Sequence, residues 1–218
     1  FLPWPSGWEA WRVLAVANVP ALGVLLLLRK DIQALLSRRL PERWKAPVIL
    51  LITFLTRMVN IQGRALWYDE AFAVLYSSLA PGRMVYGTVM PAQGAGAADV
   101  HPLLYYFLLH GWTKLAGRSP LAVRFLSVIL GMVTVAVLWR LASWRFGSRT
   151  GLAVGLLAAV NPFHVAYSQE ARMYALLGLG AALAAWGLLR GLEETRLRWW
   201  TIYAGAATVT LYAHNLGA

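Results

Sequence analysis

The sequence predicts an all-α membrane protein: a multi-pass transmembrane helical bundle of about six spans, with a long outer loop carrying juxtamembrane helices. Its 218 residues are 59% hydrophobic and only 13% charged, about half the charged share of a soluble domain. Several windows approach the roughly 20 apolar residues that a bilayer requires. Basic residues recur in the short connections between these windows, as is typical of cytoplasmic loops.

The candidate spans follow one another along the chain. They cover residues 11–28, 46–61, 120–140, 151–165, 173–189 and 199–213. Some are shorter than about 20 residues, so flanking aromatic and arginine side chains must reach the interface. Arg57 and Arg124 lie near span ends and are expected to snorkel in this way. The chain begins at Phe1 and ends at Ala218, directly after an apolar run, and both ends look cut. This favours the N-terminal part of a longer protein.

The positions of lysine and arginine predict the orientation. The connections 29–45, 140–149 and 190–198 hold most of the 20 basic residues, and we place them in the cytoplasm. Residues 62–119, 161–172 and the tail after His214 then face outward. The apolar segment 102–112 is too short to cross and is expected to lie on the outer surface as an interfacial helix. The Gly- and Pro-rich stretch 79–100 predicts a mobile loop that closes over a substrate.

Composition excludes several function classes. The net charge of +11 could suggest nucleic acid, but the basic residues do not form one patch with interleaved aromatic side chains. Membrane topology explains the charge, and no nucleic-acid partner is expected. The absence of cysteine excludes disulfides, thiolate metal sites and cysteine nucleophiles.

An adjacent acidic pair is the strongest functional candidate. The chain has only nine Asp and Glu residues, yet Asp69 and Glu70 stand side by side at an expected membrane surface. Ionisable groups at such a boundary are costly and commonly functional. Asp69 could instead cap the following helix, since Asp is a favoured N-cap, but this leaves Glu70 unexplained.

Further polar residues fall on the same outward face. Each also has a simpler structural explanation. His101 before Pro102 could simply begin the interfacial helix, and Glu170 and Arg172 could form a surface ion pair of little energetic value. His214 is most simply a solvated residue at a span end. Together these groups favour a site. A carboxylate can act as general base toward a hydroxyl, and an arginine can hold a phosphate by a bidentate contact. This combination suits transfer from a lipid-phosphate donor.

Four motifs carry a family resemblance. They are LWYDEAF at 66–72, HPLLYY at 101–106, RFLS at 124–127 and YSQEARMYA at 167–175. In this order and spacing they resemble the bacterial integral-membrane glycosyltransferases of the C-type fold, relatives of protein O-mannosyltransferases and of the lipid A aminoarabinose transferase. The resemblance covers residues 46–218, a membrane module with outer loop 62–119, and leaves 1–45 as an extra N-terminal span and basic connection.

The resemblance implies a polyprenyl-phosphate sugar donor, a lipid, glycan or protein acceptor, and an active site on the extracytoplasmic face of the plasma membrane. Asp69 matches the family's catalytic acidic residue and Glu70 its usual neighbour. Glu170 and Arg172, with Tyr174 in the same motif, match the segment that lines the donor pocket.

His101 also matches a donor-site position by this resemblance. It begins the segment where the family has a His-Pro-Pro pattern, and here Leu103 replaces the second proline. That replacement changes the expected local turn.

The leading hypothesis is an inverting glycosyltransferase in which Asp69 takes the acceptor's proton and Arg172 stabilises the departing phosphate. No cofactor is demanded, although Asp69, Glu70 and a phosphate would offer a divalent metal hard oxygen ligands. An alternative is a lipid or solute transporter or flippase subunit without transferase activity, which predicts mid-span charges and broken helices. A structural membrane subunit is a third possibility and leaves the acidic pair unexplained.

Overall fold

The computed structural model describes residues 41–89 and 101–215. The regular elements in these two ranges are α-helices, without a strand, so the all-α class is confirmed. Contacts between backbone positions divide the chain into two units, Phe1–Pro47 and Val48–Ala218. The division predicted from sequence at residues 45 and 46 stays a prediction, and the expected span 11–28 lies outside the described residues.

The described helices are named in chain order. They are α3 (Glu42–Met58), α4 (Tyr68–Ser77), α5 (Pro81–Val89), α6 (Leu104–Ala116), α7 (Pro120–Phe146), α8 (Ser148–Val160), α9 (Pro162–Ser168), α10 (Tyr174–Glu194) and α11 (Leu197–Ala213).

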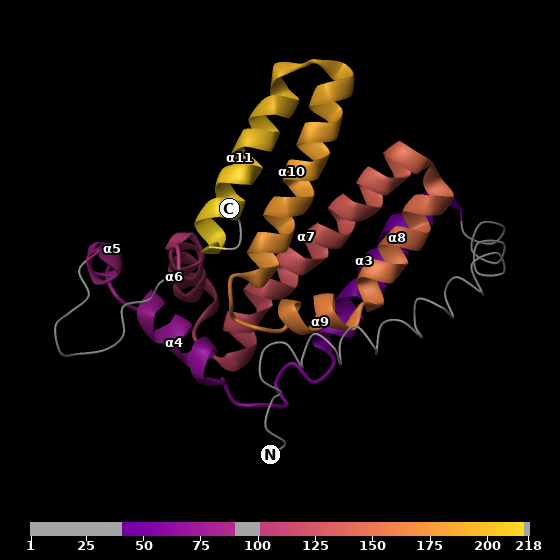
Figure 1. The fold of residues 1–218 in the computed structure, drawn as a ribbon. Coiled ribbons are helices and arrows are strands. Elements are labelled where there is room, and N and C mark those ends of the chain that lie inside the picture. The colour runs from indigo at the N-terminus through magenta and orange to yellow at the C-terminus, as the bar shows by residue number, and fades with distance from the viewer. Residues whose placement is uncertain (1–40, 90–100, 216–218) are drawn as a thin grey trace, which may run out of the picture. The chain divides into compact units, whose positions relative to one another are not determined.

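Two antiparallel helix pairs build the long part of the unit (Figure 1). Gly147, with φ of 89°, turns α7 into α8, and Thr195, with φ of 50°, turns α10 into α11. The α10–α11 pair packs closely, because a Cβ added at Gly187 would lie 2.7 Å from the Tyr203 backbone nitrogen. α10 also packs along α7.

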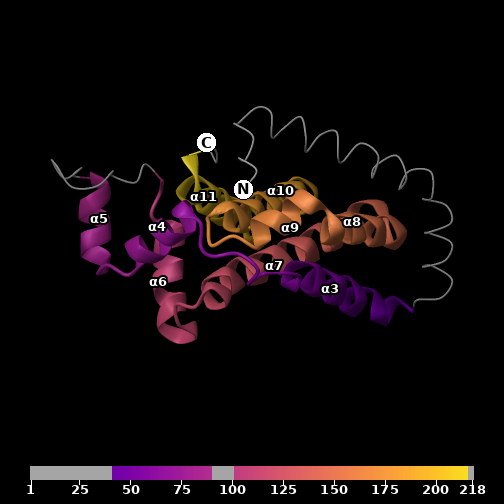
Figure 2. The ribbon, with the colours of Figure 1, turned by 90° about the horizontal axis from the view of Figure 1, so that it is seen from below.

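α3 runs in the same direction as α8 (Figure 2). Ile49, early in α3, lies against Gly155, and Arg57, in its last turn, reaches the end of α8. Successive long helices therefore alternate in direction. The C-terminal ends of α3, α8 and α11 consequently lie at the same end of the bundle as the starts of α7 and α10.

Two described helices are long and apolar enough to cross a membrane. They are α7, with a mean hydropathy of 2.4, and α10, with 1.6. The pair α8 and α9 adds a third if this segment, bent by 58°, counts as one span. α3 and α11 have 17 residues each, near the lower limit of about 17 for a span. Six spans are thus not confirmed.

Proline and polar caps define two helix starts. The Ser119 hydroxyl accepts a hydrogen bond from the Ala122 amide at 3.2 Å, with Pro120 as the first residue of α7. Asn161 accepts from the His164 amide at 2.9 Å in the same way before α9. Both are favoured N-cap arrangements. The Asn161 cap restarts the chain as α9 within residues 161–172, which were expected to be a connection.

The segment between α3 and α7 holds short helices, as expected of juxtamembrane helices. α6 has 13 residues and packs against α4, α7 and α11. Its Tyr105, Tyr106 and Leu109 are fully buried in a cluster that also includes Ala73 of α4 and Met173 before α10. The prediction of a loop throughout 79–100 is wrong for 81–89, which form α5, and 90–100 lie outside the described residues.

Candidate functional site

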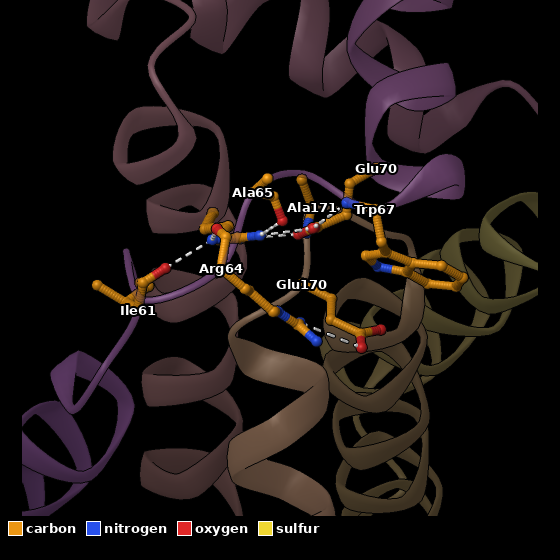
Figure 3. A network of polar contacts seen from close by, with 8 residues as sticks. Ile61, Arg64, Ala65, Trp67, Glu70, Glu170 and Ala171 are labelled. Carbon is orange, nitrogen blue, oxygen red and sulfur yellow. Dashed lines mark hydrogen bonds and ion pairs between the residues drawn. The ribbon is translucent and has the colours of Figure 1, made fainter. Parts of the chain in front are cut away.

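A buried arginine organises the loops at this end of the helices. Arg124 lies in the second turn of α7 and is 0% exposed. Its Nη1 donates to the carbonyl oxygens of Ile61 at 2.7 Å and Arg64 at 3.0 Å, and its Nη2 donates to that of Ala65 at 3.1 Å. Figure 3 shows these carbonyls turned toward the same point. Arg124 thereby fixes the chain that leads from α3 into α4.

The remaining N–H groups of Arg124 bind Glu70. Nε donates to Oε1 at 2.8 Å and Nη2 donates to Oε2 at 2.7 Å, a bidentate geometry that suits an arginine–carboxylate pair. Every N–H group of this guanidinium therefore has a protein acceptor. Since both side chains are 0% exposed, removing either partner would leave a buried charge unpaired, which is strongly destabilising.

Glu70 also binds two backbone amides. Its Oε1 accepts from the Ala171 amide at 3.0 Å, and its Oε2 accepts from the Trp67 amide at 3.3 Å, at the start of α4. Burial would raise the pKa of Glu70, but the hydrogen bonds from Arg124 and Ala171 and the charge of Arg124 outweigh it and lower the pKa. Glu70 is thus a carboxylate whose lone pairs are used to join α4, α7 and the loop before α10.

Asp69 occupies the second position of α4, and the N-cap residue of this helix is Trp67. The cap interpretation of Asp69 therefore does not hold; Glu70 is the acidic residue that binds the N-cap amide. The Asp69 side chain is 34% exposed. The two members of the acidic pair thus differ in burial: the Glu70 carboxylate is fully buried, and the Asp69 carboxylate is partly exposed.

Arg172 lies beside Asp69. Its Nη2 is 3.9 Å from Asp69 Oδ2, and its Nη1 donates at 3.4 Å to both the Asp69 carbonyl and the Tyr106 hydroxyl. These are long contacts. The side chain is only 5% exposed, and its buried Nε has no hydrogen-bond partner among the described residues. Arg172 is therefore a desolvated cation with spare donor capacity next to an open carboxylate.

Glu170 lies near the same loop but faces another partner. Its Oε1 is 3.4 Å from Arg64 Nη2, a contact visible in Figure 3. Burial raises the pKa of Glu170, with a further contribution from the charge of Glu70, against the lowering effect of Arg64 and Arg172.

Aromatic rings connect the remaining predicted residues. His101 and His214 stack edge to face with centroids 5.1 Å apart, and Tyr174 lies 5.7 Å from His214. Tyr167 continues the row at 4.6 Å from Tyr174. Burial, followed by the charges of His101 and Arg172, lowers the pKa of His214. The structure therefore brings His101, Tyr174 and His214 together near Arg172. The interpretation of His214 as a solvated residue at a span end did not include these contacts.

A second buried arginine joins α3 to the α8–α9 bend. Arg57 is 0% exposed. Its Nη1 donates to the Ala159 carbonyl at 3.0 Å, and its Nη2 donates to His164 Nδ1 at 2.6 Å. In return, Gln169 Nε2 donates to the Arg57 and Val59 carbonyls at 2.8 Å each. A Cβ at Gly131 would lie 2.2 Å from Ser168 Oγ and 3.3 Å from Arg57 Nε, so this glycine of α7 leaves room for both side chains.

The prediction that Arg57 and Arg124 snorkel to the interface is therefore wrong. Each finds carbonyl acceptors within the protein, on segments far away in sequence, and these replace water at a buried guanidinium. Arg124 is the important site residue that reasoning from charge position missed. The sequence feature that could have identified Arg124 is the family-like RFLS motif, in which it is the first cation of an otherwise apolar span.

The residues do not form a metal site by their arrangement. Within 41–89 and 101–215, no group of three or more His, Cys, Asp or Glu side chains is placed to hold an ion. Glu70, the second ligand suggested by the sequence, is already bound to Arg124 and two amides. We therefore derive no step through a metal.

The fold and site define the class: a helical membrane protein with an open carboxylate beside a buried arginine at one end of its long helices. Comparison with known families matches residues 100–214 to the dolichyl-phosphate-mannose-protein mannosyltransferase family. The chain belongs to this family, and thus to the membrane glycosyltransferases as a general class. Searches of curated proteins and of solved structures gave no significant match.

Proposed function

We propose that this protein transfers a sugar from a polyprenyl-phosphate donor to an acceptor hydroxyl at the extracytoplasmic face of the plasma membrane. The observation that carries the proposal is the pairing of Asp69, 34% exposed, with Arg172, 5% exposed, at 3.9 Å. An accessible base beside a desolvated phosphate-binding group is what this reaction needs. Family membership supports the class of reaction.

The proposed step is a single displacement at the anomeric carbon. The acceptor oxygen forms the new bond from one face while the bond from that carbon to the donor phosphate oxygen breaks on the other, so the configuration inverts. Asp69 accepts the hydroxyl proton. Arg172 binds the oxygens of the departing polyprenyl phosphate and stabilises their charge, while the polyprenyl chain remains in the membrane.

Other residues support these two groups. Glu70 and Arg124 act as positioning residues, because Glu70 follows Asp69 directly and its Oε1 binds the amide of Ala171, the residue before Arg172. One buried carboxylate thus sets the separation between the base and the phosphate-binding group. His101 and Tyr174, in the aromatic row near Arg172, are proposed to line the donor pocket, and Glu170 to orient Arg64 at its edge.

The bent α8–α9 segment is the feature that a transporter would share. Discontinuous helices in transporters expose backbone carbonyls to the cargo. Here the carbonyls of Ala158 and Ala159 accept hydrogen bonds from Arg57 at 3.3 and 3.0 Å. The bend is therefore closed by a side chain, which favours a structural role for it.

Sugar transfer in proteoliposomes tests the proposal. A polyprenyl-phosphate sugar labelled in the sugar is supplied with a hydroxyl acceptor, and labelled acceptor is measured. We expect label on the acceptor and free polyprenyl phosphate in equal amounts. Movement of intact labelled donor across the bilayer without labelled acceptor would instead support a flippase.

A further inference from the structure

The opposite end of the bundle carries a different charged cluster. We define the arginine cluster as the guanidinium groups gathered around the adjacent carboxylates Glu193 and Glu194 where α7 and α10 end and α11 begins. Its members are Arg145, Arg190, Arg196 and Arg198. We infer that the arginine cluster binds the phosphate groups of anionic phospholipids in the leaflet at this end.

Charge is the first argument. The cluster places four guanidinium groups around two carboxylates, so positive charge is in excess. Glu194 Oε2 alone is approached by Arg198 Nη2 at 3.3 Å and Arg196 Nε at 3.9 Å, and it accepts from Trp199 Nε1 at 2.8 Å. Sharing one oxygen leaves the arginine forks incompletely bound. Exposed ion pairs of this kind are weak, so a phosphate can bind these donors.

Exposure is the second argument. The side chains of Arg145, Arg196 and Arg198 are 52%, 65% and 57% exposed. Arg190 is the fixed member: its guanidinium lies 4.5 Å from the Trp144 ring and 4.9 Å from the Trp199 ring. These cation–π contacts join α7 to the α10–α11 turn. The cluster is thus held together at its centre and open at its edge.

The neighbouring apolar side chains specify a lipid. Phe146 is 68% exposed, Leu192 63%, Leu197 77% and Trp200 38%. Each lies within a few residues of a cluster arginine. A site for a soluble anion does not require exposed leucine and aromatic side chains around it. Aromatic residues and arginines at the level of the headgroups are, in contrast, typical of the membrane interface.

The distance to the candidate active site fits one bilayer. Arg124 and Arg145 lie near opposite ends of α7. At about 1.5 Å per residue their separation along the helix is about 32 Å, close to the ~30 Å thickness of the hydrocarbon core. With the Arg124–Glu70 network at one surface, the arginine cluster falls at the headgroups of the other leaflet, where anionic lipids attract basic residues.

Native mass spectrometry of the purified chain tests the inference. Protein is equilibrated in micelles containing equal amounts of phosphatidylglycerol and phosphatidylcholine, and the ratio of the two retained lipids is measured. We expect phosphatidylglycerol to be retained preferentially. The combined variant Arg145→Gln, Arg196→Gln, Arg198→Gln should lower that preference roughly tenfold or more, since each basic residue near such a surface contributes about fivefold.

A matched control removes the same charge elsewhere. Arg83, Lys114 and Arg118 are exposed residues outside the cluster, and their combined change to Gln should leave the lipid preference intact. Equal retention of both lipids by the unchanged protein, or an equal loss in the control, would overturn the inference.

A second measurement uses the unchanged protein and needs no variant. The salt concentration is raised from about 50 mM to about 500 mM, and screening should weaken the preference for phosphatidylglycerol. A ratio of the two lipids that does not depend on salt would contradict the inference.

Discussion

At the scale of single residues, the site depends on two adjacent acids with opposite environments. Glu70 is enclosed by Arg124 and two amides, while the carboxylate of Asp69, one residue earlier, is only partly buried. The sequence predicted the pair and its place at the membrane boundary. It did not distinguish the two members, because the difference arises from Arg124 and Ala171, which lie far away along the chain.

Arg172 should act on the donor. Arg172→Lys keeps the charge but loses the planar fork, so bidentate binding of a phosphate is lost. We expect the KM for the polyprenyl-phosphate sugar to rise about tenfold, given the ~1.5–3 kcal/mol of hydrogen bonds to charged groups, with the acceptor KM little changed. Arg118→Lys, at an exposed arginine that has no proposed role at the site, is the control. An unchanged donor KM in Arg172→Lys would remove it from phosphate binding.

Arg124 should act through position. Arg124→Lys can keep a contact with Glu70 but cannot reach all the carbonyls of Ile61, Arg64 and Ala65, since lysine has fewer donors in a different geometry. We expect kcat to fall more than the donor KM changes, with the protein still folded by circular dichroism. If donor KM rises while kcat is constant, Arg124 does not position the base.

At the scale of elements, helix starts were more predictable than buried contacts. The Ser-Pro start of α7 and the short length of α6 could both be read from local chemistry. α5 was mistaken for loop, because Gly82 and Gly87 resemble loop composition although Pro81 suits a first helical turn. The capping of α8 by Arg57 could not be predicted, because it requires knowing that α3 and α8 run side by side.

The link between α4 and α7 should depend on pH. The pKa of Glu70 is lowered below its ordinary value of 4.5, so its ionised form stabilises the fold above about that pH, and this stabilisation is lost as the pH falls through the lowered folded-state pKa. We expect thermal stability in micelles to drop on acidification below about pH 4.5. Glu70→Gln should be destabilised at neutral pH by about 3–5 kcal/mol and should lose part of the acid dependence.

Glu193→Gln is the control for this measurement, since that carboxylate is 51% exposed and its ion pair is long at 3.8 Å. It should retain the acid dependence of the unchanged protein. An acid response identical in Glu70→Gln and in the unchanged protein would show that Glu70 does not titrate with folding.

At the scale of the whole molecule, the alternating helices put two kinds of charged network at opposite ends. One end holds Asp69, Arg172 and the buried Arg124–Glu70 pair, and the other holds the arginine cluster. The positions of basic connections predicted this separation. They could not establish how many spans cross, because α3, α11 and the α8–α9 pair are short or bent.

Cysteine labelling tests the orientation. The chain contains no cysteine, so single variants at exposed Arg118 and Arg196 can be compared with an unreactive background. With a membrane-impermeant thiol reagent on intact cells, we expect Arg118→Cys to react and Arg196→Cys to react only after permeabilisation. The reverse pattern would place the candidate site in the cytoplasm.

The most direct measurement of the central claim is the turnover of Asp69→Asn. Asn preserves the size of the side chain but cannot accept the acceptor's proton, so transfer from a labelled polyprenyl-phosphate sugar should fall by about 10²–10⁴-fold. Donor binding, measured separately, should survive because Arg172 is unchanged and can keep its contacts with the backbone carbonyl at position 69 and the Tyr106 hydroxyl. Glu193→Gln, at the opposite end, should transfer normally. A folded Asp69→Asn protein with near-normal turnover would contradict the account.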